Sequence, residues 1–174
     1  MSDAAPPRAA PLIVTALFGG EDFAWLDGLR RRHFPPERNL VPAHCTLFHH
    51  LAPSLASELK QRLAGETRGV RAPDARIADV LPLGRGVALR IESPELEAIR
   101  DRLAEAFAAF LLPQDAAGWR PHVTIQNKAE PAQARALAAA MRAEFRPRPL
   151  AIAGLASWWY RDGPWEPHSR HMFA

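Results

Sequence analysis

The chain has 174 residues, 48% of them apolar, which is enough to bury the core of one domain or of two small lobes. Its single cysteine, Cys45, excludes an internal disulfide and a cysteine-rich zinc site. The formal net charge is +3, and nearly all the positive charge is arginine, a composition that suits phosphate ligands but also fits a codon bias of the source genome. The longest apolar stretch, residues 11–20, is too short to cross a bilayer and lacks the features of a signal peptide, so we expect a cytoplasmic protein.

The first half of the chain predicts an alternation of strands and helices. Residues 1–10 carry no periodic apolar pattern and predict a disordered leader, and the domain is expected over residues 11–174. A strand is expected over 12–18, followed by a helix that prolines 35 and 36 end. The remaining elements are a strand over 43–51, a helix from about residue 53, and strands over 77–82 and 87–91 joined by a turn at 83–86.

The second half repeats this order. Its pattern predicts helices over 94–112 and 131–145 and strands over 120–126, 151–160 and 164–173. In both halves a strand with a His-x-Thr motif precedes, at equal distance, a helix that begins at a proline, and the offset between the halves is 78 residues. We therefore expect an α+β fold made of two pseudo-equivalent lobes, one formed by strand 12–18 with residues 21–92 and the other by residues 94–173.

The His-x-Thr motifs are the candidate catalytic residues. His44 and Thr46 stand on one predicted strand, and His122 and Thr124 on the equivalent strand of the second half. Residues i and i+2 of a strand share a face, so each imidazole projects beside a hydroxyl. The alternative is two core histidines bonded to backbone groups and two threonines that reflect β-propensity.

Such a pair suits general acid-base chemistry on a phosphodiester. A neutral imidazole removes a proton from the attacking hydroxyl or water, and a protonated one gives a proton to the leaving oxygen. Threonine hydroxyls can donate to the non-bridging oxygens as charge builds in the transition state. This chemistry requires no metal or other cofactor.

The two motifs, in this order and setting, resemble those of the two-histidine (2H) phosphoesterases. That group includes the bacterial 2′,5′ RNA ligase-like proteins and the 2′,3′-cyclic nucleotide phosphodiesterases. The resemblance covers about residues 12–173. It implies a bilobal fold with antiparallel-rich sheets, helices on the outer faces and a central cleft, and substrates that end in a 2′,3′-cyclic phosphate or carry a 2′,5′ linkage.

A second group of residues is expected to bind the substrate. Lys128 follows the second motif and is a candidate to neutralise phosphate, as is Arg120 before it. Of the adjacent tryptophans Trp158 and Trp159, which must face opposite sides of a strand, we expect Trp159 to stack on a base, although packing between the lobes is an alternative. The hairpin-turn arginines Arg85 and Arg161 lie either at the mouth of the cleft or in solvent.

The other histidines are weaker candidates for a functional role. His49 and His50 are neighbours and point to opposite faces, whereas His168 and His171 predict surface positions near the end of the chain. No His-Glu-x-x-His pattern accompanies them, although a zinc or binuclear hydrolase remains an alternative.

The sequence thus predicts a monomeric enzyme, a phosphodiesterase or 2′,5′ RNA ligase-like protein, that acts on RNA ends or small nucleotides. The competing hypothesis is a non-catalytic module that binds RNA ends or nucleotides in the same cleft.

Overall fold

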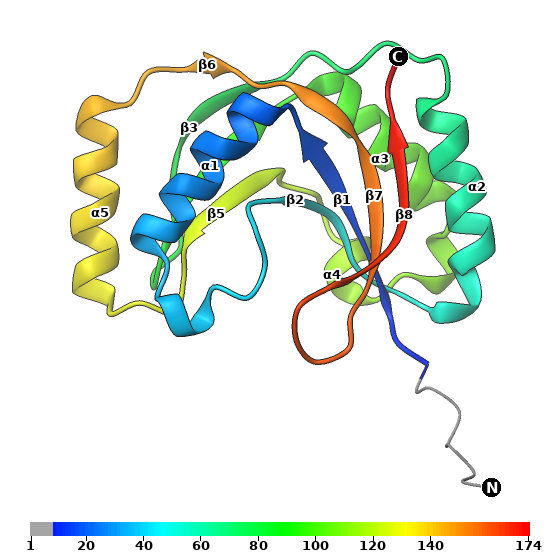
Figure 1. The fold of residues 1–174 in the computed structure, drawn as a ribbon, viewed down its shortest axis with the longest axis horizontal. Helices are drawn as coiled ribbons and strands as arrows, with labels where there is room; N and C mark the ends of the chain where they lie inside the picture. Colours follow the sequence, from blue (N-terminus) through cyan, green and yellow to red (C-terminus); the bar gives the residue numbers. More distant parts are fainter. Residues whose placement is uncertain (1–8) are drawn as a thin grey trace, which may run out of the picture.

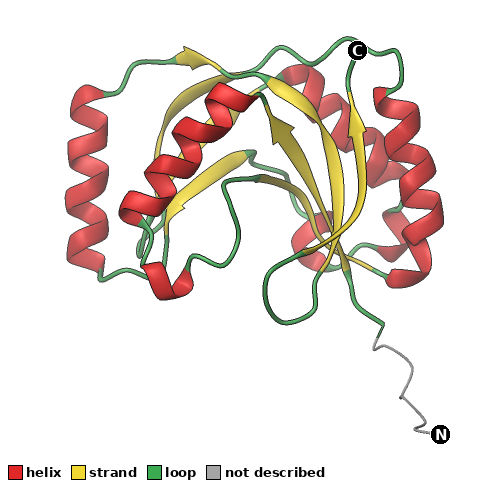
Figure 2. Cartoon of the chain, in the orientation of Figure 1, coloured by secondary structure: helices red, strands yellow, loops and turns green. Residues whose placement is uncertain are grey.

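The computed structural model describes residues 9–174, so the expected leader lies outside the described residues except for Ala9 and Ala10. Two four-stranded antiparallel sheets form the molecule, with strand orders β2-β1-β7-β8 and β5-β4-β3-β6, and helices flank them (Figures 1 and 2). The strands are β1 (Leu12–Phe18), β2 (Cys45–Leu51), β3 (Arg76–Pro82), β4 (Val87–Glu92), β5 (His122–Gln126), β6 (Arg148–Pro149), β7 (Ile152–Trp159) and β8 (Glu166–Met172). The α-helices are α1 (Gly20–His33), α2 (Ala56–Thr67), α3 (Pro94–Ala106), α4 (Pro113–Ala116) and α5 (Pro131–Glu144), and three short 3-10 turns stand at 36–38, 53–55 and 108–110.

Each sheet belongs to one lobe. The terminal lobe consists of the β2-β1-β7-β8 sheet, which is built from the two ends of the chain, with α2 packed on β7 and β8. The central lobe consists of the β5-β4-β3-β6 sheet, with α1 packed on β5 and α5 on β3 and β4. The expected α+β fold with two duplicated lobes and antiparallel sheets is therefore confirmed.

The lobes do not divide the chain into an early and a late half. β7 and β8 pair beside β1, whereas β3 and β4 pair beside β5 and β6. The division expected from the repeat, residues 21–92 and 94–173, therefore differs from the observed sheets. The repeat pattern reports the order of elements along the chain, but hydrogen bonding between strands decides which sheet each one joins.

Local sequence signals set most of the helix ends. Ser93 caps α3, and its hydroxyl accepts a hydrogen bond from the Leu96 N–H at 3.2 Å. Prolines occupy the first turn of α3, α4 and α5, where the missing N–H costs nothing. α1 ends at His33, and the next residue, Phe34, is extended before Pro35.

The helix expected over 94–112 is interrupted. α3 ends at Ala106 with Phe107 fully buried, and a 3-10 turn and the short α4 follow. Leu112 is extended (φ −74°, ψ 159°) because the next residue is Pro113, which disfavours a helical residue before it. Residues 9–174 contain no helix that is long and apolar enough to cross a membrane.

Candidate active site

The two motif-bearing strands lie at the inner edges of the two sheets and meet there. β2 is an edge strand of the terminal sheet and β5 an edge strand of the central sheet. Trp119, just before β5, donates from Nε1 to the Thr46 carbonyl oxygen at 2.9 Å. Burial raises the pKa of the Cys45 thiol to about 12, although a hydrogen bond with the His122 backbone opposes the shift. These contacts bring His44, Thr46, His122 and Thr124 to one interface.

Both histidine rings are held in the same way. Nδ1 of His44 lies 2.8 Å from the Pro42 carbonyl oxygen, and Nδ1 of His122 lies 2.7 Å from the Arg120 carbonyl oxygen. A carbonyl oxygen can only accept, so each Nδ1 carries the proton, and the neutral ring presents the lone pair of Nε2. Within residues 9–174 neither Nε2 has a hydrogen-bond partner. Each ring therefore keeps one nitrogen for proton transfer to a ligand.

The His44 imidazole is poised in its neutral form. Burial, the largest cause, lowers its pKa to about 4 from the ordinary 6.5, and the hydrogen bond to Pro42 opposes the shift. Positive charge on Arg30, His122 and His49 lowers the pKa further. Trp165 packs edge-on against the ring at 4.6 Å between centroids. At neutral pH His44 is thus an acceptor of protons.

The two threonines complete the pair of motifs. Thr46 pairs with Thr15 on β1, and Thr124 pairs with Ala88 on β4. Both side chains are half-buried, and among the described residues neither hydroxyl has a hydrogen-bond partner. Free hydroxyls at an otherwise fixed edge can donate to oxygens of a bound phosphate.

Two buried arginines fix the strands that carry the motifs. Arg30 of α1 donates from Nη1 to the Thr124 carbonyl oxygen at 2.9 Å, and Arg100 of α3 donates from Nε to the Leu47 carbonyl oxygen at 3.0 Å. Each guanidinium also covers a phenylalanine ring, Arg30 on Phe34 at 4.2 Å and Arg100 on Phe48 at 4.3 Å. α1 thereby supports the motif strand of the central lobe, and α3 supports the motif strand of the terminal lobe.

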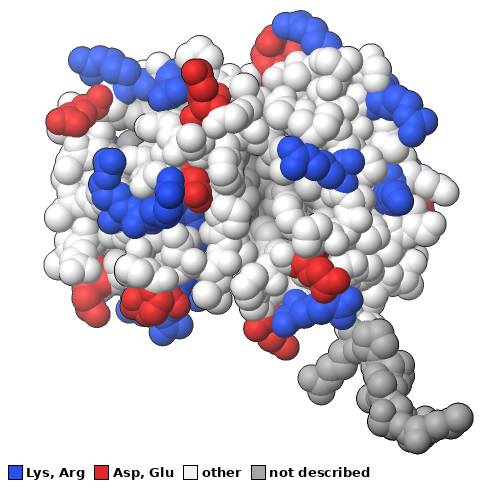
Figure 3. Space-filling view, viewed as in Figure 1, with Lys and Arg blue, Asp and Glu red and all other residues white. Residues whose placement is uncertain are grey.

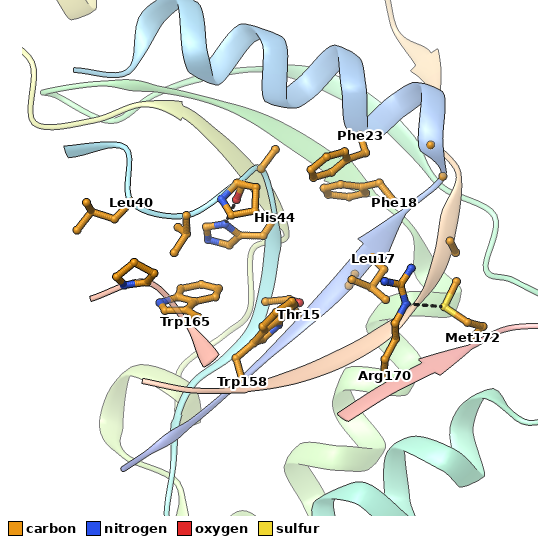
Figure 4. A pocket seen from close by; sticks show the side chains of 18 residues that line it. Thr15, Leu17, Phe18, Phe23, Leu40, His44, Trp158, Trp165, Arg170 and Met172 are labelled. Atoms are coloured by element: carbon orange, nitrogen blue, oxygen red, sulfur yellow. Dashed lines mark hydrogen bonds between the residues drawn. The ribbon is translucent and has the colours of Figure 1, made fainter. Parts of the chain in front are cut away.

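A cavity of about 520 Å³ opens beside His44 (Figure 4). Its walls include Thr15 and Phe18 of β1, Trp158 of β7 and Trp165 before β8. Trp158 is fixed by a hydrogen bond of 2.9 Å from its Nε1 to the Thr15 hydroxyl. The cavity makes the His44 side of the interface able to hold an organic group.

The structure does not bring Lys128 and Arg85 to the histidines. His122 begins β5 and Gln126 ends it, about 13 Å further on at the rise of an extended strand. Lys128 follows in the next turn, and Arg85 lies beside that turn, with its Nε donating to the Ala129 carbonyl oxygen at 3.1 Å. Lys128 and Arg85 therefore lie near the far end of β5 from His122, and their role in substrate binding stays a prediction.

Trp159 and Arg161 also lie outside the cavity. Trp159 packs against the hydrophobic core and stacks edge-on with His168, so its neighbour Trp158 is the one that faces the cavity. Arg161 lies 5.7 Å over the Trp159 ring and donates to Glu166 at 2.8 Å. The sequence requires the two tryptophans to face opposite sides of the strand but does not say which side is the cleft.

The remaining candidates have structural surroundings of their own. Arg120 is exposed and supplies the carbonyl that orients His122. Asp115 of α4, only 1% exposed, accepts from the backbone N–H groups of His49 and His50 and lies 3.1 Å from the His49 ring. Within residues 9–174, no three His, Cys, Asp or Glu side chains are grouped to hold a metal ion.

Sequence reasoning missed Thr15, Trp165 and Arg170 in the cavity and Arg90 beside His122. Arg90 is the direct β4 partner of His122 and pairs with Asp79 at 3.1 Å. Thr15 and Arg170 become neighbours of the site only through the order of strands in the terminal sheet. No local pattern in the sequence marks them.

Two antiparallel lobes that meet along edge strands, each with a histidine and a threonine on one face, define the class of two-histidine phosphoesterases. The family model described as the 2′-5′ RNA ligase superfamily matches residues 19–164, and the chain belongs to that superfamily. The resemblance found from the sequence is thereby confirmed.

Solved structures share this fold at low sequence identity. Escherichia coli LigT, complexed with 3′-AMP, is 19% identical with a TM-score of 0.57, and the alignment covers 96% of this chain and 99% of LigT. The crystal structure of a phosphoesterase is 18% identical with a TM-score of 0.60, and the alignment covers 95% of this chain and 99% of the other. The protein TT0787 of Thermus thermophilus is 18% identical with a TM-score of 0.58, over 94% and 97%. Comparison with curated proteins gave no match.

Proposed function

We propose that this protein is a metal-independent enzyme that opens 2′,3′-cyclic phosphates, or makes and breaks 2′,5′ linkages, at RNA or nucleotide ends. The observation that carries the proposal is the matched anchoring of the two imidazoles. Each Nδ1 is bonded to the carbonyl two residues upstream, so that both rings keep Nε2 for a ligand at the same interface.

In this reaction the two histidines take different roles. His44, whose pKa is lowered to about 4 chiefly by burial, is the base that removes a proton from the attacking water or hydroxyl. His122 is the acid that returns a proton to the oxygen leaving phosphorus. One P–O bond forms and one breaks, which leaves His44 protonated and His122 neutral. Proton exchange with water returns both imidazoles to their starting states before the next turnover.

Thr46 and Thr124 stabilise the intervening state. The negative charge of the pentavalent phosphorus develops on its non-bridging oxygens, where each hydroxyl donates a hydrogen bond. Arg30 and Trp119 hold the backbone carbonyls of Thr124 and Thr46, so the backbone positions of both threonines are fixed before the substrate arrives. Donors at fixed positions reduce the reorganisation that the reaction requires.

The comparisons support a nucleotide ligand. E. coli LigT was crystallised with 3′-AMP, with ATP and with NADP⁺, so that protein binds nucleotides. By analogy we propose RNA ends or small nucleotides as the partners of this chain. The analogy concerns the ligand class, because the fold alone does not fix a reaction.

The test is a turnover panel on the pure protein. Nucleoside 2′,3′-cyclic phosphates, oligonucleotides with a cyclic end and 2′,5′-linked dinucleotides are incubated with wild type, His44→Ala, His122→Ala and the control His50→Ala. We expect each active-site variant to lose about 10²- to 10⁴-fold in kcat with the fold intact, and the control to keep its rate. If the wild type binds these compounds but turns none of them over, the protein is instead a binding module.

A further inference from the structure

The cavity beside His44 is one-sided although the catalytic motifs are duplicated. Its lining residues come from β1, the start of α1, residues 40–44, β7 and the segment from Pro164 to Met172. None comes from the central sheet. A ligand held across both histidines therefore places its bulk on the terminal lobe.

The cavity walls are largely aromatic. In Figure 4, Phe18 and Phe23 lie along one side and Trp158 and Trp165 along the other, with His44 toward one end. The rings of the two tryptophans are 6.4 Å apart at 48°, and the Thr15 hydroxyl anchors Trp158. We call these four side chains with the space between them the aromatic slot. Stacking on aromatic rings is the usual way in which proteins hold an unpaired base.

A single guanidinium stands at the other end of the slot. Arg170 is the only Lys or Arg among the residues that line the cavity, and no Asp or Glu lines it. The register places Thr46, Thr15, Ala156 and Arg170 in one row across the four strands, which sets the Cα atoms of Thr46 and Arg170 about 14 Å apart.

The Arg170 guanidinium has few partners within the described structure. Its hydrogen bond in the described structure runs from Nε to the Met172 sulfur at 3.5 Å, a weak acceptor (Figure 4). Among residues 9–174 no carboxylate pairs with it. A guanidinium with free donors in a slot without acidic groups is suited to an anion, and above all to phosphate.

The volume of the cavity and the distribution of charge on the surface favour a short ligand. The cavity of about 520 Å³ falls in the range of small-molecule sites. On the face shown in Figure 3, the Lys and Arg side chains form separate groups, with Asp, Glu and uncharged residues between them. They do not form a continuous basic band on this face. A long RNA backbone would need such a band.

We propose that the aromatic slot binds the base of a mononucleotide and that Arg170 binds its second phosphate, at the 5′ position. This rests on the proposed function. It narrows the substrate class to nucleoside 2′,3′-cyclic phosphates that also carry a 5′-phosphate, with the cyclic phosphate between His44 and His122 and the 5′-phosphate at Arg170.

Equilibrium binding tests the slot without any turnover. Tryptophan fluorescence is titrated with 5′-AMP, adenosine, ribose 5-phosphate and decyl phosphate. Wild type should bind 5′-AMP at least tenfold more tightly than each of the other three. Arg170→Gln should weaken 5′-AMP about 10- to 100-fold and leave adenosine unchanged, whereas Trp158→Leu should weaken both. The control Arg135→Gln, on α5 of the central lobe, should behave as wild type.

Three results would overturn the inference: equal affinity for ribose 5-phosphate and 5′-AMP, tighter binding of decyl phosphate, or an unchanged preference for 5′-AMP in Arg170→Gln. A turnover arm separates this inference from the proposed function. It compares kcat/KM for adenosine 2′,3′-cyclic phosphate with and without a 5′-phosphate. If kcat/KM is the same with and without the 5′-phosphate, the inference is contradicted and the proposed function is not. If the binding results are as expected but neither compound is turned over, the proposed function is contradicted and the binding inference is not.

Discussion

Thr46 and Thr124 carry hydroxyls that no described residue engages, although each stands on a strand whose backbone is firmly bonded. β-propensity alone explains a threonine on a strand, but it does not explain two such hydroxyls beside two anchored imidazoles. Their position fits donors that wait for a phosphate.

Replacing either threonine by valine should therefore lower kcat by about 10²-fold, the effect of removing one donor to developing charge. Valine keeps the shape and β-propensity of threonine, so the melting temperature should change little. Thr46→Ser and Thr124→Ser, which keep the hydroxyl, serve as matched controls and should recover most of the rate. Equal rates in the valine and serine variants would exclude a role for the hydroxyls.

At this scale the sequence predicts local geometry but not distant neighbours. His44 and Thr46 could be assigned to one face because the period of a strand is two residues. Arg170 could not be placed, because it reaches the row of Thr46 and Thr15 only through two intervening strand pairings. Lys128 looked close to His122 along the chain, yet the length of β5 separates them.

Among the helices, α1 and α3 each deliver one buried arginine to a motif strand, Arg30 to β5 and Arg100 to β2. Arg30 is 4% and Arg100 5% exposed, and their donors satisfy carbonyls of β5 and β2. Arg100 also donates to the Asp115 carbonyl at 2.7 Å, and Asp115 in turn anchors the far part of β2. The helices thus hold the motif strands in register.

Arg100→Met should lower the free energy of unfolding by about 1–3 kcal/mol, because buried carbonyls lose their donors. Arg30→Met should do the same and also lower kcat, because the Thr124 carbonyl is released. Urea unfolding and steady-state kinetics measure both effects. Arg62→Met, which breaks an exposed pair with Glu58 on α2, is the matched control and should cost under about 1 kcal/mol. A loss in the control as large as in the buried variants would contradict this role.

Element prediction succeeds where periodicity is long and fails where it is interrupted. The strand expected over 12–18 is β1 to the residue, and the helix expected over 131–145 is α5 to within one residue. The apolar pattern from 94 to 112 hides the break after Ala106, because Leu111 and Leu112 continue it outside a helix. β6, with two residues, is too short to leave a period.

For the whole molecule, the duplication was visible in the sequence but its assembly was not. The terminal sheet combines β1 and β2 with β7 and β8, so the two ends of the chain form one lobe. Long-range pairing of this kind follows from the packing of complete elements, which a repeat offset does not encode. The lining of the cavity beside His44, which takes no residue from the central sheet, follows from the same assembly.

The site as a whole contains proton carriers and hydroxyl donors, and the described residues 9–174 group no metal ligands there. Turnover of a cyclic phosphate should be unchanged by dialysis against EDTA, since the proposed steps use no Lewis acid. Activity that disappears with the chelator and returns with zinc or manganese would require a metal-dependent mechanism. The spare histidines, His49, His50, His168 and His171, would then be the ligand candidates to test.

The pH dependence of kcat/KM on a cyclic-phosphate substrate tests the central claim most directly. His44 must be unprotonated and its partner protonated, so the profile should be a bell. Because the pKa of His44 is lowered to about 4, the acid limb should lie near pH 4, well below that of an ordinary imidazole. His44→Ala should remove the acid limb and His122→Ala the alkaline limb, with circular dichroism verifying the fold at each pH. A rate that climbs steadily to about pH 10 in the wild type, with no alkaline limb, would contradict the paired-histidine mechanism.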